Sequence, residues 1–380
     1  MLYTPFKNLK LSALGLGCMR FPTLEDNETV DKAALSKIVE RAISGGINYF
    51  DTAWIYHNGK SEILMGEVLK KYPRESYYLA DKFPGYDLEN MGKVEEIFEK
   101  QLEKCGVDYF DFYLFHNVSE GSINEYLDPK YRTFEYLYEQ KKNGRIRHLG
   151  FSTHGTVDTM KRFLDAYGEY MEFCQIQLNW LDFRLQGAKA KVELLNSYGI
   201  PIWVMEPVRG GRLAALEEKY ETELKELRPE ASIPEWAFRF LQSIPGVALT
   251  LSGMSNLEQI DENIRIFSEP KPLNEREMKA ILGIADKMMS EKDALPCTAC
   301  RYCISHCPME LEIPELIQHY NEFVYSKSGG RAKTVIATLP ESKRPSACIG
   351  CRSCEAVCPQ NIKISEMMQG FTQKLNEPKG

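Results

Sequence analysis

The repeated alternation of short apolar runs with longer amphipathic segments most constrains the fold of this chain. Seven runs rich in β-branched and aromatic residues recur at residues 47–53, 77–83, 109–116, 146–152, 173–179, 200–207 and 246–253. Each run is short and nearly continuous, which is typical of a strand buried on both faces. The intervening segments carry apolar residues at helical spacing. Strands that alternate with helices predict a parallel sheet covered by those helices.

The number of strand–helix units predicts a closed barrel rather than an open sheet. A (β/α)₈ TIM barrel typically spans about 250 residues, which the alternating part of this chain provides. The sequence offers residues 264–267 (IRIF) as the eighth strand. The alternation ends after residue 285, and a polar stretch follows. We therefore predict a barrel over residues 1–288 and a second domain over residues 289–380.

The second domain carries two copies of one cysteine pattern. Eight of the 11 cysteines lie between residues 297 and 358, and each copy reads C-x₂-C-x₂-C-x₃-C-P. An offset of 51 residues superimposes the two copies, and an apolar stripe at helical spacing follows each, beginning at Ile313 and at Ile364. These features predict a small, mainly helical domain that arose by duplication.

This cysteine pattern resembles that of the bacterial ferredoxins, in which three thiolates bind one cubane and the fourth reaches across to the other. The resemblance implies two [4Fe-4S] clusters in a ferredoxin-like domain. The ligands would be Cys297, Cys300, Cys303 and Cys358 for one cluster, and Cys348, Cys351, Cys354 and Cys307 for the other. Zinc and disulfides are the alternatives. A third cysteine followed by Cys-Pro exceeds what a tetrahedral zinc site uses, and a reducing compartment disfavours disulfides.

Charge and hydropathy exclude several classes of partner. The formal net charge is -7, and no run of Lys and Arg is long enough to follow a nucleic-acid backbone. No apolar run approaches the roughly 18 residues of a membrane span, and the N-terminus lacks the pattern of a signal peptide. We therefore expect a cytoplasmic protein that binds neither nucleic acid nor membrane.

Polar residues stand where the first predicted strands end. Asp51, Lys82 and His116 each close an apolar run, and Tyr56 follows in the first loop. In a barrel of this kind, chemistry takes place at the C-terminal ends of the strands. A phenol has an ordinary pKa near 10, so we expect a neighbouring ammonium to lower it for proton transfer to a carbonyl. The alternative for any one of these residues is a buried polar group with a purely structural role.

At this point residues 1–285 resemble the aldo-keto reductase superfamily. The segments YFDTAWIYHNGKSEILMGEVL, YYLADKF and DYFDFYLFHN match those that carry its catalytic Asp, Tyr, Lys and His. The resemblance implies that Tyr56 is the general acid/base and that Lys82 lowers its pKa. It also implies that Asp51 pairs with Lys82 and that His116 orients the carbonyl and assists the proton relay.

The same resemblance implies a nicotinamide cofactor, NADP(H) or NAD(H). Ser152 and Gln175 would hold its carboxamide, with Asn179 nearby, and the glycines of VMEPVRGGR, with Arg209 and Gly210, would approach its pyrophosphate. The segment SGMSNLEQIDEN reads as a turn that enters a helix, with Ser255 and Glu258 in capping-box spacing. Its amides could face a phosphate or merely cap the helix.

Two departures from the family pattern affect the cofactor site. Met205 stands where the family usually has a Tyr that stacks on the nicotinamide, so stacking becomes a thioether contact. Gly253, Met254 and Gln259 stand where many members have the Lys, Ser and Arg that hold the 2′-phosphate of NADP. The choice between NADP and NAD therefore stays open. Glu262 and Asn263 still match the pair on the adenine side.

Three classes of function compete for this chain. The first is a nicotinamide-dependent oxidoreductase that interconverts a small-molecule carbonyl and an alcohol, with clusters that transfer electrons, dock a redox partner such as a ferredoxin, or stabilise the fold. The alternative is a ferredoxin-linked protein whose clusters feed electrons to a substrate or cofactor in the barrel. A non-enzymatic binding subunit is disfavoured by the intact set of Asp51, Tyr56, Lys82 and His116.

Overall fold

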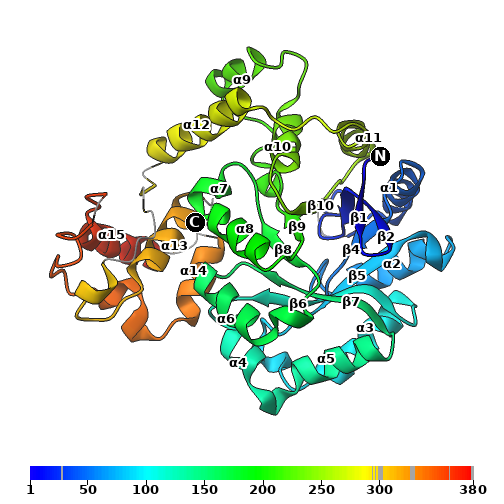
Figure 1. Ribbon diagram of the computed structural model, residues 1–380, viewed down its shortest axis with the longest axis horizontal. Helices are drawn as coiled ribbons and strands as arrows, with labels where there is room; N and C mark the ends of the chain where they lie inside the picture. Colours follow the sequence, from blue (N-terminus) through cyan, green and yellow to red (C-terminus); the bar gives the residue numbers. More distant parts are fainter. Residues whose placement is uncertain are drawn as a thin grey trace. The chain divides into compact units, whose positions relative to one another are not determined.

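The computed structural model describes residues 1–26, 29–292, 294–295, 297, 303–325, 330–358 and 360–377 (Figure 1). The chain folds into two compact units. The first contains residues 1–179 and 190–278, and the second contains residues 180–189 and 279–380. The second unit thus includes a ten-residue segment that the sequence places inside the barrel region.

The first unit is a closed barrel of eight parallel strands, which confirms the predicted (β/α)₈ fold. The strands follow the order β10-β3-β4-β5-β6-β7-β8-β9 around the barrel. Their bounds are Leu14–Gly17 (β3), Tyr49–Asp51 (β4), Tyr78–Phe83 (β5), Phe110–Val118 (β6), Ile146–Thr153 (β7), Cys174–Gln177 (β8), Ile202–Met205 (β9) and Val247–Ser252 (β10). Each of the seven apolar runs contains one of these strands.

The prediction of the eighth strand at residues 264–267 is wrong. Those residues end the helix α11 (Leu257–Ile266), in which Ile260, Asn263 and Ile266 are buried at intervals of three. The missing strand is β3, which pairs with both β10 and β4. Four residues with two glycines give too weak a pattern for sequence-based assignment.

Helices cover the outside of the ring of strands (Figure 1). Polar side chains fix several of their starts: Asp31 accepts hydrogen bonds from the amides of Ala33 and Ala34, and Thr156 accepts one from Thr159. The helices are α1 (Lys32–Ser44), α2 (Ser61–Leu69), α3 (Val94–Cys105), α4 (Ile123–Leu127), α5 (Thr133–Lys142), α6 (Val157–Tyr167), α8 (Ala188–Ser197), α9 (Glu218–Lys225), α10 (Ile233–Gln242) and α11. Short 3₁₀ helices lie at Arg74–Ser76, Leu88–Asn90, Pro129–Tyr131, Gly168–Tyr170 and Arg209–Gly211.

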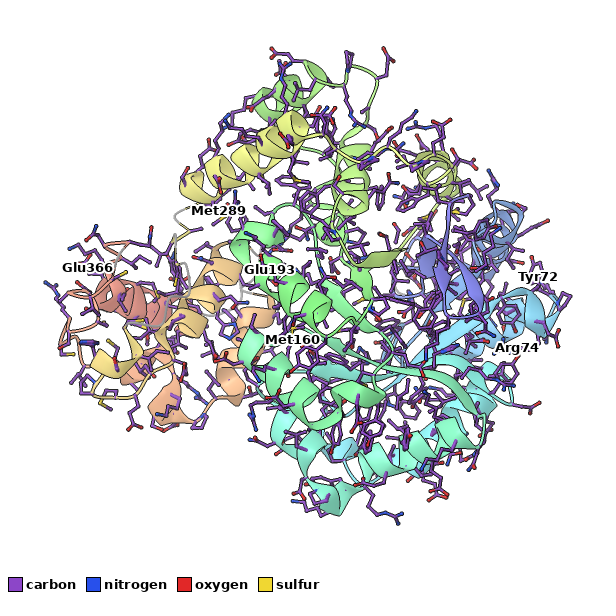
Figure 2. The ribbon with its side chains drawn as sticks, in the orientation of Figure 1. Tyr72, Arg74, Met160, Glu193, Met289 and Glu366 are labelled. Carbon is purple, nitrogen blue, oxygen red and sulfur yellow. The ribbon has the colours of Figure 1, made fainter. Side chains whose placement is uncertain are left out.

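An antiparallel hairpin of β1 (Tyr3–Phe6) and β2 (Leu9–Ser12) closes one end of the barrel. Phe6 is buried, and its ring lies 5.6 Å from that of Phe112 and 5.1 Å from that of Trp203. Both partners lie near the starts of their strands, and side chains fill the interior of the barrel (Figure 2). The hairpin therefore blocks the N-terminal ends of the strands and leaves the C-terminal ends for a site.

The second unit is helical, as predicted. Its helices are α7 (Asp182–Leu185), most of α12 (Glu275–Glu291), α13 (Ile313–Tyr325), α14 (Gly330–Thr338) and α15 (Ile364–Asn376), with 3₁₀ helices at Ile304–His306, Glu341–Lys343 and Pro345–Ala347. The stripes of α13 and α15 meet in one core that contains Leu316, Ile317, Met368 and Phe371. No helix within the described ranges is long and apolar enough to cross a membrane.

The segment that follows β8 packs as part of this second unit. The Gln186 Nε2 donates a hydrogen bond to the Glu322 Oε2 at 2.6 Å, and the Gln318 Nε2 donates one to the Gln186 carbonyl at 3.4 Å. Arg184 lies 3.5 Å from Asp286. Residues 180–189 therefore belong by their contacts to the helical unit, although the chain enters them directly from a barrel strand.

Candidate active site and cluster ligands

A cavity of about 430 Å³ opens at the C-terminal ends of the barrel strands. This volume lies within the usual range for a small-molecule or cofactor site. Seven of the eight strands contribute a residue at or near their ends, namely Gly17, Asp51, His116, Ser152, Gln175, Met205 and Ser252. The predicted residues Tyr56, Gly210, Gly253, Met254, Gln259, Glu262 and Asn263 also line it.

Three of the four predicted catalytic residues, Asp51, Tyr56 and His116, line this cavity, and the fourth, Lys82, pairs with Asp51. The Lys82 ammonium lies 2.6 Å from the Asp51 Oδ1 and 2.6 Å from the Thr52 carbonyl oxygen, and Lys82 and Asp51 are buried. The same ammonium lies 5.1 Å from the centre of the Tyr56 ring. The Tyr56 ring meets that of His116 edge to face, with centroids 6.3 Å apart. An ammonium, a phenol and an imidazole thus surround one point.

The pKa of the phenol differs from the sequence-based expectation. Burial raises the pKa of Tyr56 to about 12, and the charge of Lys82 and its hydrogen bond to Tyr56 only partly oppose this rise. Desolvation outweighs the ammonium because the phenolate would be a second charge in a buried site. We expected a lowered pKa, and this expectation is wrong for the net shift. Tyr56 is therefore protonated at neutral pH.

The neighbouring groups have defined protonation states. Burial disfavours the charge of Lys82, but the Asp51 carboxylate holds the pKa of this ammonium above its ordinary value. Burial and the charge of Lys82 place the pKa of His116 well below its ordinary value. Lys82 is therefore a cation and His116 a neutral imidazole, so His116 can hydrogen bond to a carbonyl oxygen without competing for the proton.

Unpartnered polar atoms indicate what the cavity accommodates. Within the described residues, the buried Gln175 Oε1 and His116 Nδ1 have no hydrogen-bond partner. The Ser152 Oγ accepts a hydrogen bond from the Asn117 amide at 2.8 Å, so its hydroxyl proton remains available. One acceptor and one donor on neighbouring strands match a primary amide. The residues present therefore fit a nicotinamide carboxamide. Asn179 instead donates to the Glu206 carbonyl.

The far end of the cavity is formed by backbone that approaches closely. Gly210 and Gly211 have φ of 65° and 93°, which favour glycine. A Cβ on Gly210 would lie 3.0 Å from the Arg20 side chain, and one on Gly253 would lie 3.1 Å from it. Arg209 is buried and does not line the cavity. Gly210 and Gly253 therefore form a cradle, because a larger residue at either position would press against the Arg20 side chain.

The cap of α11 lies one residue later than predicted. Asn256 is the N-cap, and its side chain accepts a hydrogen bond from the Gln259 amide at 2.9 Å. The Ser255 hydroxyl donates to the Arg20 carbonyl, and the Ser255 amide donates to the Gln259 side chain. The predicted cap by Ser255 and Glu258 is therefore wrong, because a partner distant in sequence engages the serine hydroxyl.

Several cavity residues were not predicted from the sequence. They include Met19, Arg20, His154, Glu206 and Phe238. Arg20 lies 3.9 Å from Glu206, and both side chains are partly exposed. Arg20 follows β3, the strand that was missed, so its loop was not counted among those at the mouth. Assigning the run LGLG to a strand would have identified it.

One predicted set of cluster ligands surrounds a single cavity in the second unit. Cys307, Cys348, Cys351 and Cys354 all line it, although 40 residues of chain separate the first two in the sequence. The Leu311 amide also points to the Cys307 Sγ at 3.5 Å. A cysteine of one motif thus lines the same cavity as three cysteines of the other, which is the arrangement that crossed ligation of a cubane uses.

The other predicted set is described in part. Cys300 lies outside the described residues. Cys303 is buried in the core of the unit, and Cys297 and Cys358 pack against that core. Among the residues with assigned positions, no three His, Cys, Asp or Glu side chains are grouped to hold a single metal ion.

Comparison with known proteins identifies two domains in this chain. Residues 13–286 match the aldo/keto reductase family and residues 296–362 match a 4Fe-4S dicluster domain. The uncharacterized oxidoreductase YqkF of Bacillus subtilis is 28% identical over 306 residues, which cover 72% of this chain and 92% of that protein. The NADH-specific methylglyoxal reductase of Escherichia coli is 26% identical, over 68% of this chain and 90% of that protein.

Solved structures show the same fold. The holo form of the aldo-keto reductase AKR11C1 from Bacillus halodurans superimposes with a TM-score of 0.60 at 26% identity, covering 75% of this chain and 96% of that one. The thermostable aldo-keto reductase Tm1743 gives a TM-score of 0.62 at 23% identity, over 75% of this chain and 100% of that one.

The barrel, its polar cavity and these matches define an oxidoreductase fold. More particularly, the chain belongs to the aldo/keto reductase family, and it carries a 4Fe-4S dicluster domain in addition.

Proposed function

We propose that this chain transfers a hydride between NAD(P)H and the carbonyl carbon of a small aldehyde or ketone, reversibly. The observation that carries this proposal is the convergence of Tyr56, His116 and the Lys82–Asp51 ion pair on a cavity that also exposes the unpartnered Gln175 Oε1. An acid, a neutral hydrogen-bonding imidazole and an amide-binding pair in one cavity support carbonyl reduction.

The cavity residues divide between the parts of the cofactor. Ser152 and Gln175 would hold the carboxamide, and Met205 would contact the nicotinamide ring through its thioether. The glycine cradle of Gly210 and Gly253 would admit the pyrophosphate, with Met254, Gln259, Glu262 and Asn263 towards the adenosine. When bound, the cofactor supplies the hydride.

The protein supplies the proton and the geometry. The carbonyl oxygen would lie against Tyr56 and His116 while its carbon accepts the hydride, that is, one hydrogen together with two electrons. The proton of the Tyr56 hydroxyl then moves to that oxygen and yields an alcohol. Lys82 stabilises the phenolate that remains, and solvent returns a proton to it. In the reverse direction the phenolate takes the alcohol proton. Asp51 keeps the ammonium charged and in place.

The experiment that tests this proposal is turnover by anaerobically purified protein. Methylglyoxal with NADH is the first pair to try, because a relative at 26% identity is named for that reaction. We expect saturable oxidation of NADH or NADPH that depends on the carbonyl, and quenching of protein fluorescence by either nucleotide. Absence of nucleotide binding at millimolar concentration would contradict the proposal.

We also propose that the dicluster domain binds two [4Fe-4S] clusters through the two cysteine sets. The convergence of Cys307 with Cys348, Cys351 and Cys354 supports the crossed ligation. A cluster passes one electron at a time whereas a hydride carries two, and the sequence shows no flavin motif to couple them. The clusters would therefore serve a redox partner such as a ferredoxin or a structural role, rather than the hydride step.

One observation favours the alternative, in which the clusters feed electrons to the barrel. Residues 180–189 follow Asn179 directly and fold with the cluster-bearing unit. Replacing Cys300 and Cys351 together by Ser should cripple both clusters. If the hydride proposal holds, NAD(P)H-driven reduction of a simple aldehyde survives in the folded double variant. If the alternative holds, that activity is poor from the start and reduced ferredoxin replaces the nucleotide.

A further inference from the structure

A buried polar network lies behind the catalytic loop and has no part in the mechanism above. It joins Glu62 on α2 to Gln101 and Lys104 on α3, and Glu62 and Gln101 have no exposed surface. The two helices approach closely at Gly66, where a Cβ would lie 2.5 Å from the Cys105 carbonyl oxygen. This approach places the side chains of one turn of α2 directly against α3.

One arm of the network reaches the backbone of Lys82. The Gln101 Nε2 donates to the Glu62 Oε1 and to the Lys82 carbonyl oxygen, both at 3.0 Å. The Tyr113 hydroxyl donates to the Gln101 Oε1 at 2.5 Å, which fixes the orientation of the amide. The peptide that carries the catalytic ammonium is therefore held by a side chain that is itself fully bonded.

The other arm reaches the loop that carries Tyr56. The Lys104 ammonium forms an ion pair with Glu62 and lies 4.2 Å from the centre of the Trp54 ring. Trp54 precedes Tyr56 by two residues, and a Cβ on Gly59 would lie 4.0 Å from the same ammonium. Cation–π contact with Trp is the strongest of its kind. Lys104 thus contacts the catalytic loop through Trp54, before Tyr56, and lies close to Gly59, after it.

Two carboxyl groups and one ammonium meet in this network. Asp81 is buried next to Glu62, and burial and the charge of Glu62 hold the pKa of Asp81 well above its ordinary value. Lys104 supplies the ammonium that forms an ion pair with Glu62. Without Lys104 this buried carboxylate would lose its counter-ion, which is strongly unfavourable.

We propose that Lys104 is a positioning residue for Tyr56, acting through Trp54 and the Glu62 ion pair. The inference rests on the proposed function, because it assigns Tyr56 as the acid. A loop displaced by about 1 Å can cost a factor of about 100 in rate. Lys104 would therefore act on the chemical step and leave nucleotide binding unchanged, since the carboxamide and phosphate residues lie on other loops.

The test replaces Lys104 by Met, with Lys100→Met as the matched control. Lys100 lies on the same helix and is exposed, paired only with exposed Glu103. We expect Lys104→Met to lower kcat by about 10- to 100-fold, with the Kd of the nucleotide changed less than about threefold. Lys104→Arg should restore most of the rate, because it keeps both the charge and the ring contact. An unchanged kcat, or an equal loss in Lys100→Met, would overturn the proposal.

A double-mutant cycle separates positioning from general destabilisation. In a Tyr56→Phe background, Lys104→Met should have almost no further effect on kcat, because there is no acid left to misplace. A full additional loss would show that Lys104 acts elsewhere. If Tyr56→Phe itself retains full activity, the proposed function fails instead, and the two failures are distinct.

A second variant covers the case in which Lys104→Met does not fold. Glu62→Gln combined with Lys104→Met removes both charges and keeps the acceptor for Gln101. This pair leaves no buried unpaired charge, yet it still removes the ammonium from Trp54. We expect the same loss of kcat. Full activity in the folded pair would refute the role of Lys104.

Discussion

The phenol of Tyr56 gives the sharpest test of the proposed chemistry. Tyr56→Phe removes a single oxygen atom and keeps the ring that faces His116. A positioned general acid contributes a factor of about 10² to 10⁴ in rate, or about 3 to 5 kcal/mol of barrier. Within the described residues of the cavity, Tyr56 alone supplies a phenol. We therefore expect kcat for carbonyl reduction to fall by at least ~10².

The raised pKa of this phenol adds a pH dependence with a definite sign. Burial moves the pKa from its ordinary value of 10.0 to about 12. Reduction requires the protonated phenol, so kcat/KM for reduction should stay level through pH 10 and fall only as the pH approaches 12. Alcohol oxidation requires the phenolate, so the rate of oxidation should rise with pH until the pH reaches about 12. The Phe variant should lose both dependences.

The assay follows NAD(P)H absorbance at saturating aldehyde, with nucleotide Kd measured separately by fluorescence. Tyr86→Phe is the matched control, because the Tyr86 ring contacts the same imidazole at 4.9 Å and its pKa is likewise raised to about 12. We expect this control to keep its rate within about tenfold. Equal losses in both variants, or full activity in Tyr56→Phe, would refute the assignment of the acid.

The remaining predictions concern the clusters and the nucleotide. Anaerobically prepared protein should contain about eight iron and eight sulfide per chain. A content of four iron and four sulfide would contradict the presence of two clusters. Cys307→Ala should remove the cluster bound by Cys348, Cys351 and Cys354. Gln259→Arg should lower the Kd of NADPH by about tenfold and leave that of NADH unchanged in calorimetry, because only NADPH carries the 2′-phosphate that the added cation would bind. No change for NADPH would place the 2′-phosphate elsewhere.

The sequence predicted most of the barrel because seven of its strands lie in apolar runs rich in β-branched and aromatic residues. It missed β3, whose four residues include Gly15 and Gly17 and whose register with β10 and β4 comes from tertiary pairing. Because β3 was not predicted, Arg20, which lies in the loop after that strand, was absent from the predicted site. Residues at the ends of recognised strands, such as Asp51 and His116, were predictable because strand ends meet at one mouth.

Other features depend on contacts that no local pattern encodes. The pKa of Tyr56 results from a competition between burial and the charge of Lys82, and only the structure shows that burial prevails. The cap of α11 moved to Asn256 because Ser255 bonds to Arg20, 235 residues earlier in the chain. Gln186 and Glu322 are 136 residues apart, so their hydrogen bond could not be read from spacing.

The assignment of residues 180–189 to the helical unit bears on why an aldo/keto reductase barrel carries a dicluster domain. These residues leave β8 just after Gln175, the side chain that fits the carboxamide, and their own partners Glu322 and Gln318 lie on α13. Helix α13 follows directly on the cysteine loop that ends at Cys307. A domain that loses its clusters would therefore change the support of a segment that is covalently continuous with β8, the strand that carries Gln175. Structural support and electron transfer can thus be separated by experiment. A structural role requires only that the clusters be present, in either redox state. An electron-transfer role requires that reduction of the clusters change the rate of turnover.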